Sequence, residues 1–185
     1  MKSILISIQP QWVEKILNGE KTIEIRKTVP KCEFPCKVYI YCTKGKPYLY
    51  RIDDDNKFET INKLRFEEDC FVKDYNCQNG KVVAEFILNG VVKFNIESIM
   101  FLGKQQELMQ KSQLGGLSLR KYLGNGVGYA WHIDNLKIYD KPKELNKFYT
   151  YDTAYNNMFG WAFTEEEKRK YLKRPPQSWC YVEEL

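Results

Sequence analysis

Short runs of alternating apolar and polar residues constrain the fold of this chain more than any other feature. In the run at 3–8, Ile4, Ile6 and Ile8 share one face. A period of two places neighbouring side chains on opposite faces of a β-strand, so such runs predict strands with a buried face. By the same reasoning, further strands are expected at 21–26, 37–42, 82–88, 91–94, 129–133, 136–139 and 178–182.

The helical patterns between these runs are short. Pro10 suits the first turn of a helix that ends at Asn18 and Gly19. Asn89 followed by Gly90 is a strong signal for a hairpin between its flanking strands. Weaker helical patterns lie at 104–111, at 119–123 after Ser118 as a cap, at 142–148 and at 165–172. The sequence therefore predicts an α+β fold, a small mixed β-barrel with short peripheral helices and insertions, rather than alternating βαβ units.

The length of 185 residues predicts a single domain covering 1–185. Residues 44–78 are polar and rich in turn formers, with 53–56 as the expected tip of a hairpin, and they suggest an insertion into the core fold. A C-terminal extension at about 149–185 is expected to return a closing strand. With 43% hydrophobic and 29% charged residues, the composition is that of a globular protein and excludes a disordered one.

Several classes of protein are disfavoured by the sequence. No stretch approaches the ~18 apolar residues of a transmembrane helix, and Gln9 and Pro10 interrupt the N-terminal apolar run too early for a signal peptide. A cytoplasmic location, reduced thiols and no membrane partner are therefore expected. The six cysteines lack paired metal-site spacing and there is one histidine, so neither a metal nor another cofactor is predicted. The net charge of +5 permits nucleic-acid binding without demonstrating it.

The segment GEKTIEIRK, residues 19–27, concentrates charge on one short element. On a strand, Glu24 and Arg26 share one face, Ile23 and Ile25 occupy the other, and Lys21 stands at the start. This arrangement brings an ammonium, a carboxylate and a guanidinium within a few ångströms of one another. It suits either a polar binding cleft or a solvated face whose ion pairs contribute little stability.

These residues carry a resemblance to a known family. Gly19, Lys21, Glu24 and Arg26 match G-x-K-x-x-E-x-R, the motif of the ASCH domain in the PUA-like superfamily, in the position after strand, helix and glycine that the family gives it. The chain resembles the longer ASCH proteins of bacteria and their phages. Its later segments YAWHIDNLKIYDKPKEL (129–145) and RPPQSWCYV (174–182) are similar to theirs, and the resemblance omits only about 44–78 and 149–170.

The resemblance implies a PUA-like barrel with a cleft beside the first helix that binds RNA, a nucleotide or a nucleoside. Lys21 and Arg26 suit phosphates or base acceptors, and Glu24 suits an exocyclic amine. Related domains stack a nucleotide on aromatic walls, for which Trp12 and Trp131 are candidates, although both also suit a core.

Two further residues complete the predicted site. Ser7 lies on the polar face of the first strand as a hydrogen-bonding candidate. His132 follows Trp131 on a strand, so only one of the two can face the cleft. The predicted ligand-binding residues are Ser7, Lys21, Glu24, Arg26, Trp131 and His132.

Two alternative functions remain open. One branch similar to ASCH proteins hydrolyses acetylated cytidine with a lysine, a threonine nucleophile and a glutamate, but Glu24 occupies the threonine position here, so the attacking hydroxyl is lacking. If the chain were a hydrolase of a modified nucleoside or of RNA, Lys21 and Glu24 would carry the acid–base chemistry. A protein-interaction role is the other alternative. Basic residues at 168–174 are a second possible nucleic-acid contact or a solvated helix face.

Overall fold

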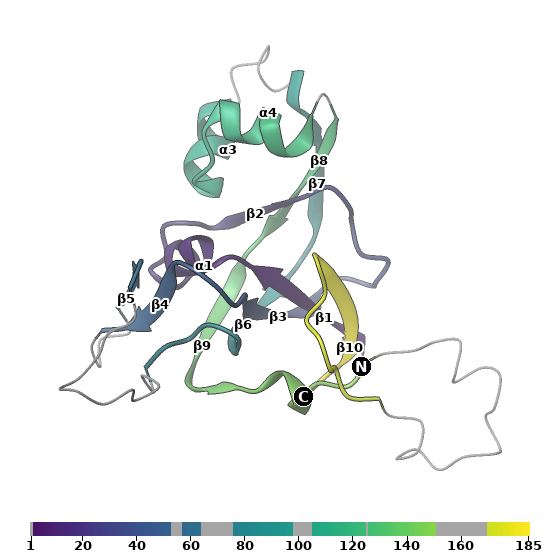
Figure 1. The fold of residues 1–185 in the computed structure, drawn as a ribbon. Coiled ribbons are helices and arrows are strands. Elements are labelled where there is room, and N and C mark those ends of the chain that lie inside the picture. The colour runs from purple at the N-terminus through teal and green to yellow at the C-terminus, as the bar shows by residue number, and fades with distance from the viewer. Residues whose placement is uncertain (1, 53–56, 64–75, 98–104, 125, 151–169) are drawn as a thin grey trace, which may run out of the picture.

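The structure, a computed structural model, describes residues 2–52, 57–63, 76–97, 105–124, 126–150 and 170–185 (Figure 1). The strands are β1 (Lys2–Ile8), β2 (Ile23–Arg26), β3 (Cys36–Cys42), β4 (Tyr48–Arg51), β5 (Phe58–Ile61), β6 (Val82–Leu88), β7 (Val91–Asn95), β8 (Val127–His132), β9 (Asp134–Lys143) and β10 (Trp179–Glu183). The helices are α1 (Pro10–Leu17), α3 (Gln105–Ser112), α4 (Gly116–Leu123) and the 3-10 turn η1 (Leu145–Lys147).

Hydrogen bonds arrange these strands in three sheets. The largest has the order β10-β1-β3-β6-β9, in which only β1 and β3 run parallel. The second has the order β2-β8-β7, and β4 pairs with β5 in the third. The α+β class is confirmed. A closed barrel is not detected among the described strands, so the barrel stays a prediction.

The predicted hairpin at Asn89 and Gly90 is wrong. β6 pairs with β3 and β9, whereas β7 pairs with β8 in the other sheet, so the two strands that flank Asn89 and Gly90 diverge. Gly90 also lacks the positive φ that a two-residue I′ turn requires. Instead the Asn89 amide donates to Asp134 Oδ2 at 2.9 Å, next to the junction of β8 and β9, where the chain changes sheets a second time.

Other local predictions also needed correction. The helix expected at 142–148 is the end of β9 followed by η1. Ser118 lies inside α4, whose N-cap is Gly115. The hairpin tip at 53–56 and most of the helix expected at 165–172 fall outside the described residues, although β4 and β5 pair in the antiparallel sense that a hairpin requires. The insertion at 44–78 and the extension at 149–185 stay predictions.

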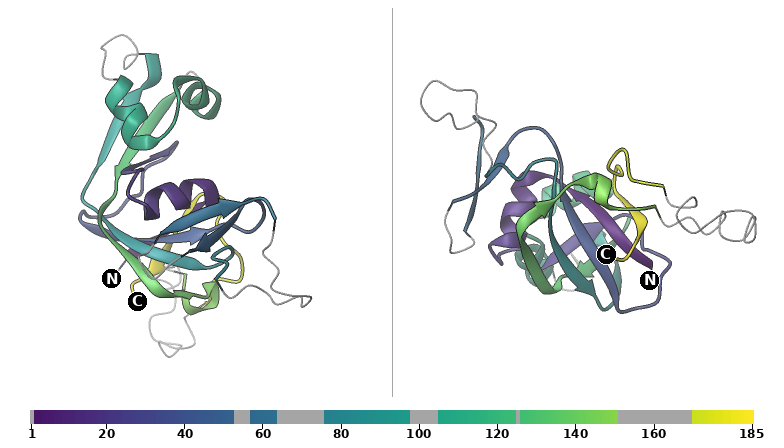
Figure 2. Two further views of the ribbon diagram at one scale, coloured as in Figure 1. Left: turned by 90° about the vertical axis from the view of Figure 1, so that its left-hand side faces the viewer. Right: turned by 90° about the horizontal axis from the view of Figure 1, so that it is seen from below.

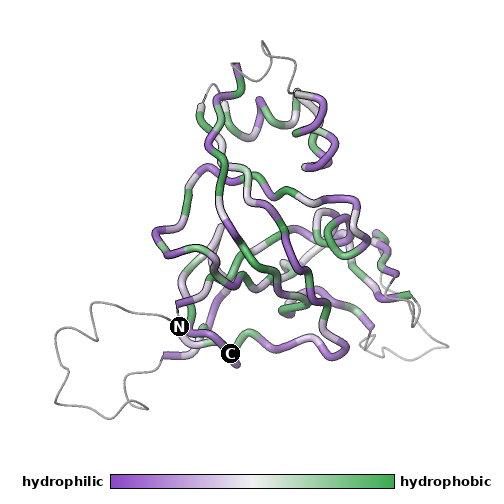
Figure 3. Tube along the Cα trace, turned by 180° about the vertical axis from the view of Figure 1, so that it is seen from behind, coloured by the Kyte–Doolittle hydropathy of each residue, from purple (hydrophilic) through white to green (hydrophobic). Residues whose placement is uncertain are grey.

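Two of the three buried apolar clusters hold the layers around the site together. In the main core, Val13 and Ile16 of α1 belong to the same cluster as Ile4, Ile6 and Ile40 of the large sheet. The second cluster joins α4 to β2, β7 and β8, and its buried members are Ile23, Ile25, Phe94, Ile96, Leu119, Leu123 and Ala130. The central strands β1, β2 and β3 are buried on both faces, and hydrophobic residues are interspersed with hydrophilic ones along the trace (Figure 3). The sheet of β2 thus lies between α1 and the α3–α4 pair (Figures 1 and 2).

Gly128 allows β8 to pack closely against Phe94 and against Leu123 of α4 in this second cluster. A Cβ atom built at Gly128 would clash with the Phe94 ring and would lie 2.8 Å from Leu123 Cδ1. Gly128→Ala is therefore expected to lower the free energy of unfolding by about 1–3 kcal/mol, the usual cost of overpacking. Urea denaturation followed by circular dichroism measures this change. Gly90→Ala, where an added Cβ meets open space and φ is not positive, is the matched control. Equal stability of the two variants would show that Gly128 has room for a side chain.

Candidate ligand-binding cavity

The polar face of β2 is buried, not solvated. Only 2% of Lys21 and 8% each of Glu24 and Arg26 are exposed. Gly19 ends α1 at φ +77°, and the Lys21 amide then donates to the Lys15 carbonyl at 2.9 Å, which turns the chain back toward β2. Because these three side chains are almost fully buried, the alternative of a solvated strand face is wrong. β8 pairs along the edge of β2.

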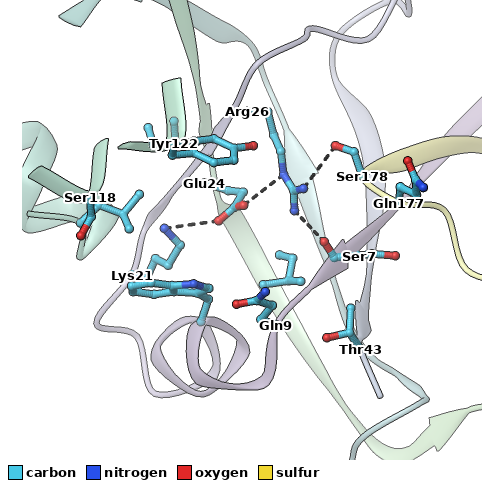
Figure 4. Close-up of a pocket in the computed structure, with 14 residues that line it drawn as sticks. Ser7, Gln9, Lys21, Glu24, Arg26, Thr43, Ser118, Tyr122, Gln177 and Ser178 are labelled. Atoms are coloured by element: carbon cyan, nitrogen blue, oxygen red, sulfur yellow. Dashed lines mark hydrogen bonds and ion pairs between the residues drawn. The ribbon is translucent and has the colours of Figure 1, made fainter. Parts of the chain in front are cut away.

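The three charged side chains form one connected group (Figure 4). Glu24 Oε2 lies 3.3 Å from Lys21 Nζ, and Oε1 lies 3.1 Å from Arg26 Nε. The second contact is an ion pair without hydrogen-bond alignment, because Arg26 Nε has no hydrogen-bond acceptor among the described residues. Two cations share one carboxylate, so this Lys21–Glu24–Arg26 triad carries a net charge of +1.

Backbone and hydroxyl groups hold the two cations in place. Lys21 Nζ donates to the Ser112 carbonyl at 2.6 Å, at the end of α3. Arg26 Nη2 donates to the Ser7 carbonyl at 2.8 Å, and Nη1 donates to Ser178 Oγ at 3.3 Å. The triad therefore connects β2 to α3, to the end of β1 and to the segment before β10.

A cavity of about 610 Å³ opens beside the triad, within the range of ligand-binding pockets. In the close-up, Ser118 and Tyr122 of α4 lie on one side of the triad, and Gln177 and Ser178 lie on the other (Figure 4). Trp12 of α1 also lines the cavity, with its ring centre 5.6 Å from Lys21 Nζ. The remaining lining residues are Ser7, Ile8, Gln9, Lys21, Glu24, Ile25, Arg26, Thr43 and Leu114.

Comparison with solved structures shows which known fold this arrangement of elements resembles. No protein-family model matches the chain, and no curated protein is similar to it. Among solved structures, ASCH from Zymomonas mobilis superposes with a TM-score of 0.56 at 15% identity, covering 98% of this chain and 87% of that one. The chain has the ASCH fold. A Ser→Ala variant of the Zymomonas protein (TM-score 0.56, 14% identity, 98% and 88% covered) and a Tyr→Phe variant (0.56, 15%, 99% and 91%) match equally well.

Within this ASCH fold, four of the six predicted site residues meet at the cavity: Ser7, Lys21, Glu24 and Arg26. Ser7 takes part in an unexpected way. Its carbonyl accepts from Arg26, whereas its buried Oγ has no hydrogen-bond partner in the part of the chain that the structure describes.

Trp131 and His132 do not line this cavity. Trp131 pairs with Glu24 across β2 and β8, but its ring is fully buried in the main core, 5.9 Å from the ring of Trp179. His132 pairs with Ile23 and is partly exposed. Trp131 instead fills the core beneath the β2–β8 pair. Of the two tryptophans predicted as candidate walls, Trp12 lines the cavity and Trp131 does not.

Sequence reasoning did not find the far side of the cavity. Tyr122 and Ser118 come from α4, and Gln177 comes from the segment before β10. These residues are about 90 to 150 positions from the motif, and no local pattern marks them. The only signal was the resemblance of 174–182 to the later ASCH segment, which contains Gln177 and Ser178.

The described residues hold no cluster of three or more histidine, cysteine, aspartate or glutamate side chains that could bind a metal ion. None of the described helices is long and apolar enough to cross a membrane.

Burial perturbs the Lys21 ammonium. Desolvation lowers the pKa of Lys21 below its ordinary value of 10.5, and the nearby Glu24 carboxylate only partly opposes this shift. Below the folded-state pKa the group is protonated in both states and burying its charge opposes folding. Between the two pKa values the unfolded chain binds more protons, so stability rises with pH in that window.

We therefore expect the free energy of unfolding of the natural chain to rise, relative to Lys21→Met, as pH increases toward 10.5. The comparison with Lys21→Met is needed because buried tyrosines, including Tyr39 and Tyr41, have raised pKa values and act in the opposite direction at alkaline pH. Urea denaturation at several pH values between 7 and 10.5 measures the difference. A difference that stays constant over this range would show that Lys21 titrates as a solvated lysine.

Proposed function

We propose that this chain binds RNA or a nucleotide-like ligand, and that the cavity beside Lys21, Glu24 and Arg26 holds one nucleotide unit. The observation that carries the proposal is a buried, hydrogen-bonded charge cluster with net positive charge in the wall of an open cavity. The ASCH fold and the G-x-K-x-x-E-x-R motif support the same reading.

The charge balance favours a ligand over a purely structural role. Burying ions is costly, and the cost is greatest for a buried charge that no opposite charge compensates. Here Glu24 faces both Lys21 and Arg26, so one positive charge is left for an anion or an acceptor. A phosphate or the acceptor edge of a base would supply that partner.

Arg26 has donors to spare for such a ligand. A guanidinium carries five N–H groups. The hydrogen bonds of Arg26 to Ser178 and Ser7 occupy two of them, and Nε faces Glu24 at 3.1 Å as an ion pair. Because these contacts also fix the plane of the group, its remaining donors are oriented in advance. Preorganised donors of this kind are suited to a planar acceptor edge or a phosphate.

The aromatic walls suit a base. Unpaired bases are commonly recognised by stacking on tryptophan or tyrosine, and both Trp12 and Tyr122 line the cavity. Tyr122 is 39% exposed although it contacts the site, so its ring is available to a ligand. The amides of Gln9 and Gln177 can donate to and accept from base edges.

Removal of either wall is expected to weaken binding by about 5- to 150-fold, the range for losing one stacked base. Trp12→Ala and Tyr122→Ala are titrated against the four nucleoside monophosphates and a fluorescein-labelled pool of eight-nucleotide RNAs. Phe34→Ala removes a similarly exposed ring that does not line the cavity. If the two wall variants and Phe34→Ala bound every probe like the natural chain, the cavity would not be the binding site.

Hydrolysis of a modified nucleoside or of RNA is the second candidate function. The observation that favours it is the position of Lys21 and Glu24 in the cavity wall, with Lys21 Nζ 3.3 Å from Glu24 Oε2. In such a reaction Glu24 would act as a general base on water while Lys21 polarised a carbonyl or phosphoryl oxygen. Chromatography of acetylated cytidine and of short RNAs after incubation tests this function. Unchanged substrates, or turnover that persists in Glu24→Gln, would remove it.

A further inference from the structure

A second cavity, of about 760 Å³, is lined by three lysines, three tyrosines and one glutamate among other residues. The charged members are Lys44, Lys147, Lys173 and Glu144, and they give the cavity a net charge of +2. Its position and its chemistry both relate it to the first cavity.

Two chain segments pass from one cavity to the other. Thr43 lines the first cavity, whereas its neighbour Lys44 lines the second. Near the C-terminus, Gln177 lines the first cavity and Pro175 lines the second. Consecutive Cα atoms are about 3.8 Å apart, so at both places the chain that lines one cavity continues directly into the chain that lines the other.

Two of the three tyrosines of the second cavity, Tyr149 and Tyr171, pack against each other. The ring centres of Tyr149 and Tyr171 are 4.6 Å apart with an interplanar angle of 33°. A short antiparallel bridge holds them, in which the Leu172 amide donates to the Phe148 carbonyl and the Thr150 amide donates to the Lys170 carbonyl, each at 2.8 Å. Tyr171 is 56% exposed, so this ordered pair presents an aromatic surface to solvent.

Lysines beside exposed aromatic rings are the elements that bind a single strand without base specificity. The ammonium groups follow the phosphates, and the rings stack with bases because every base has a π face. Lys44, Lys147 and Lys173 are all exposed, as contacts to a flexible phosphate backbone require. A free nucleoside would need only the first cavity.

We infer that the second cavity is a subsite for the adjoining nucleotides of a single-stranded nucleic acid whose neighbouring unit occupies the first cavity. This inference rests on the proposed function and narrows it, because it makes the ligand a polymer rather than a free nucleoside or nucleotide. Lys44 and Lys173 contact phosphates of the strand, and Tyr171 stacks on a base.

The test compares a polymer with its monomers. Fluorescence anisotropy measures binding of a labelled pool of eight-nucleotide RNAs, and titration calorimetry measures binding of the four nucleoside monophosphates. We expect the pool to bind at least tenfold more tightly than any monomer. Tyr171→Ala should weaken binding of the pool about tenfold, and should leave binding of the monomers unchanged.

Salt dependence tests the lysines separately. Each phosphate contact to a single strand contributes about 0.7 to the slope of log affinity against log salt, so the double variant Lys44→Ala/Lys173→Ala should lower the slope by about 1.4. Lys93→Ala/Lys141→Ala removes two exposed lysines that line neither cavity and is the matched control. The salt slope of this control should differ less from that of the natural chain than the slope of Lys44→Ala/Lys173→Ala does.

The outcomes separate the two proposals. If Arg26→Ala weakens binding of the pool while Tyr171→Ala and the Lys44/Lys173 variant bind it like the natural chain, the second subsite is overturned and the first cavity stands. Equal affinity for pool and monomers also overturns the subsite. If neither the pool nor the monomers bind the natural chain, both proposals fail.

Discussion

Replacing Glu24 with alanine is expected to lower the free energy of unfolding by about 3–5 kcal/mol, the cost of leaving buried charges without their partner. The carboxylate is the only anion of the triad, and it faces Lys21 at 3.3 Å and Arg26 at 3.1 Å. Its removal leaves two buried cations close together. Urea denaturation at pH 7, followed by circular dichroism, measures the change.

The chain offers a matched control for this substitution. Glu20 pairs with Lys15 at 3.1 Å, but that pair is exposed, so Glu20→Ala should cost less than about 1 kcal/mol. Adding Lys21→Met to Glu24→Ala should recover part of the loss, because one unpaired cation is then removed. If Glu24→Ala cost no more than Glu20→Ala, the triad would be solvated and the charge argument for a ligand would fail with it.

Most of the strands, with the exception of β4 and β5, and α1 could be predicted because their signals are local. The alternation at 3–8 specifies a strand wherever it lies, and Pro10 and Gly19 mark the two ends of one helix. Pairing is different, since it depends on distant partners. Asn89 and Gly90 suggest a hairpin, but β7 pairs with β8, more than 30 residues away, because Phe94 packs with Leu119 and Leu123 in the second cluster.

In the candidate site, too, local features could be predicted whereas those that depend on distant segments could not. The period of two correctly placed Glu24 and Arg26 on one face of a strand, but it could not say whether that face would be covered. The cover comes from Ser112 at the end of α3, from Tyr122 on α4 and from Ser178 before β10. Periodicity likewise indicates which face of a helix or strand carries a tryptophan, but not what packs against that face. It therefore could not decide that Trp12 lines the cavity while Trp131 fills the core.

Arg26→Ala is expected to weaken binding of nucleotides and RNA by about 10- to 150-fold, the equivalent of one charge-assisted hydrogen-bond contact of about 1.5–3 kcal/mol. The guanidinium is held by Ser7 and Ser178, so it needs no reorganisation to meet a ligand. Titration with the nucleoside monophosphates and the labelled RNA pool measures the loss, and circular dichroism checks that the variant is folded.

Two companion variants separate charge from geometry. Arg51→Ala removes an arginine that does not line the cavity and should bind as the natural chain does. Arg26→Lys keeps the charge but loses the planar set of donors, so it should retain the salt dependence of binding while losing most of the affinity. Full affinity in Arg26→Lys would mean that Arg26 acts only as a charge, and full affinity in Arg26→Ala would place the ligand elsewhere on the molecule.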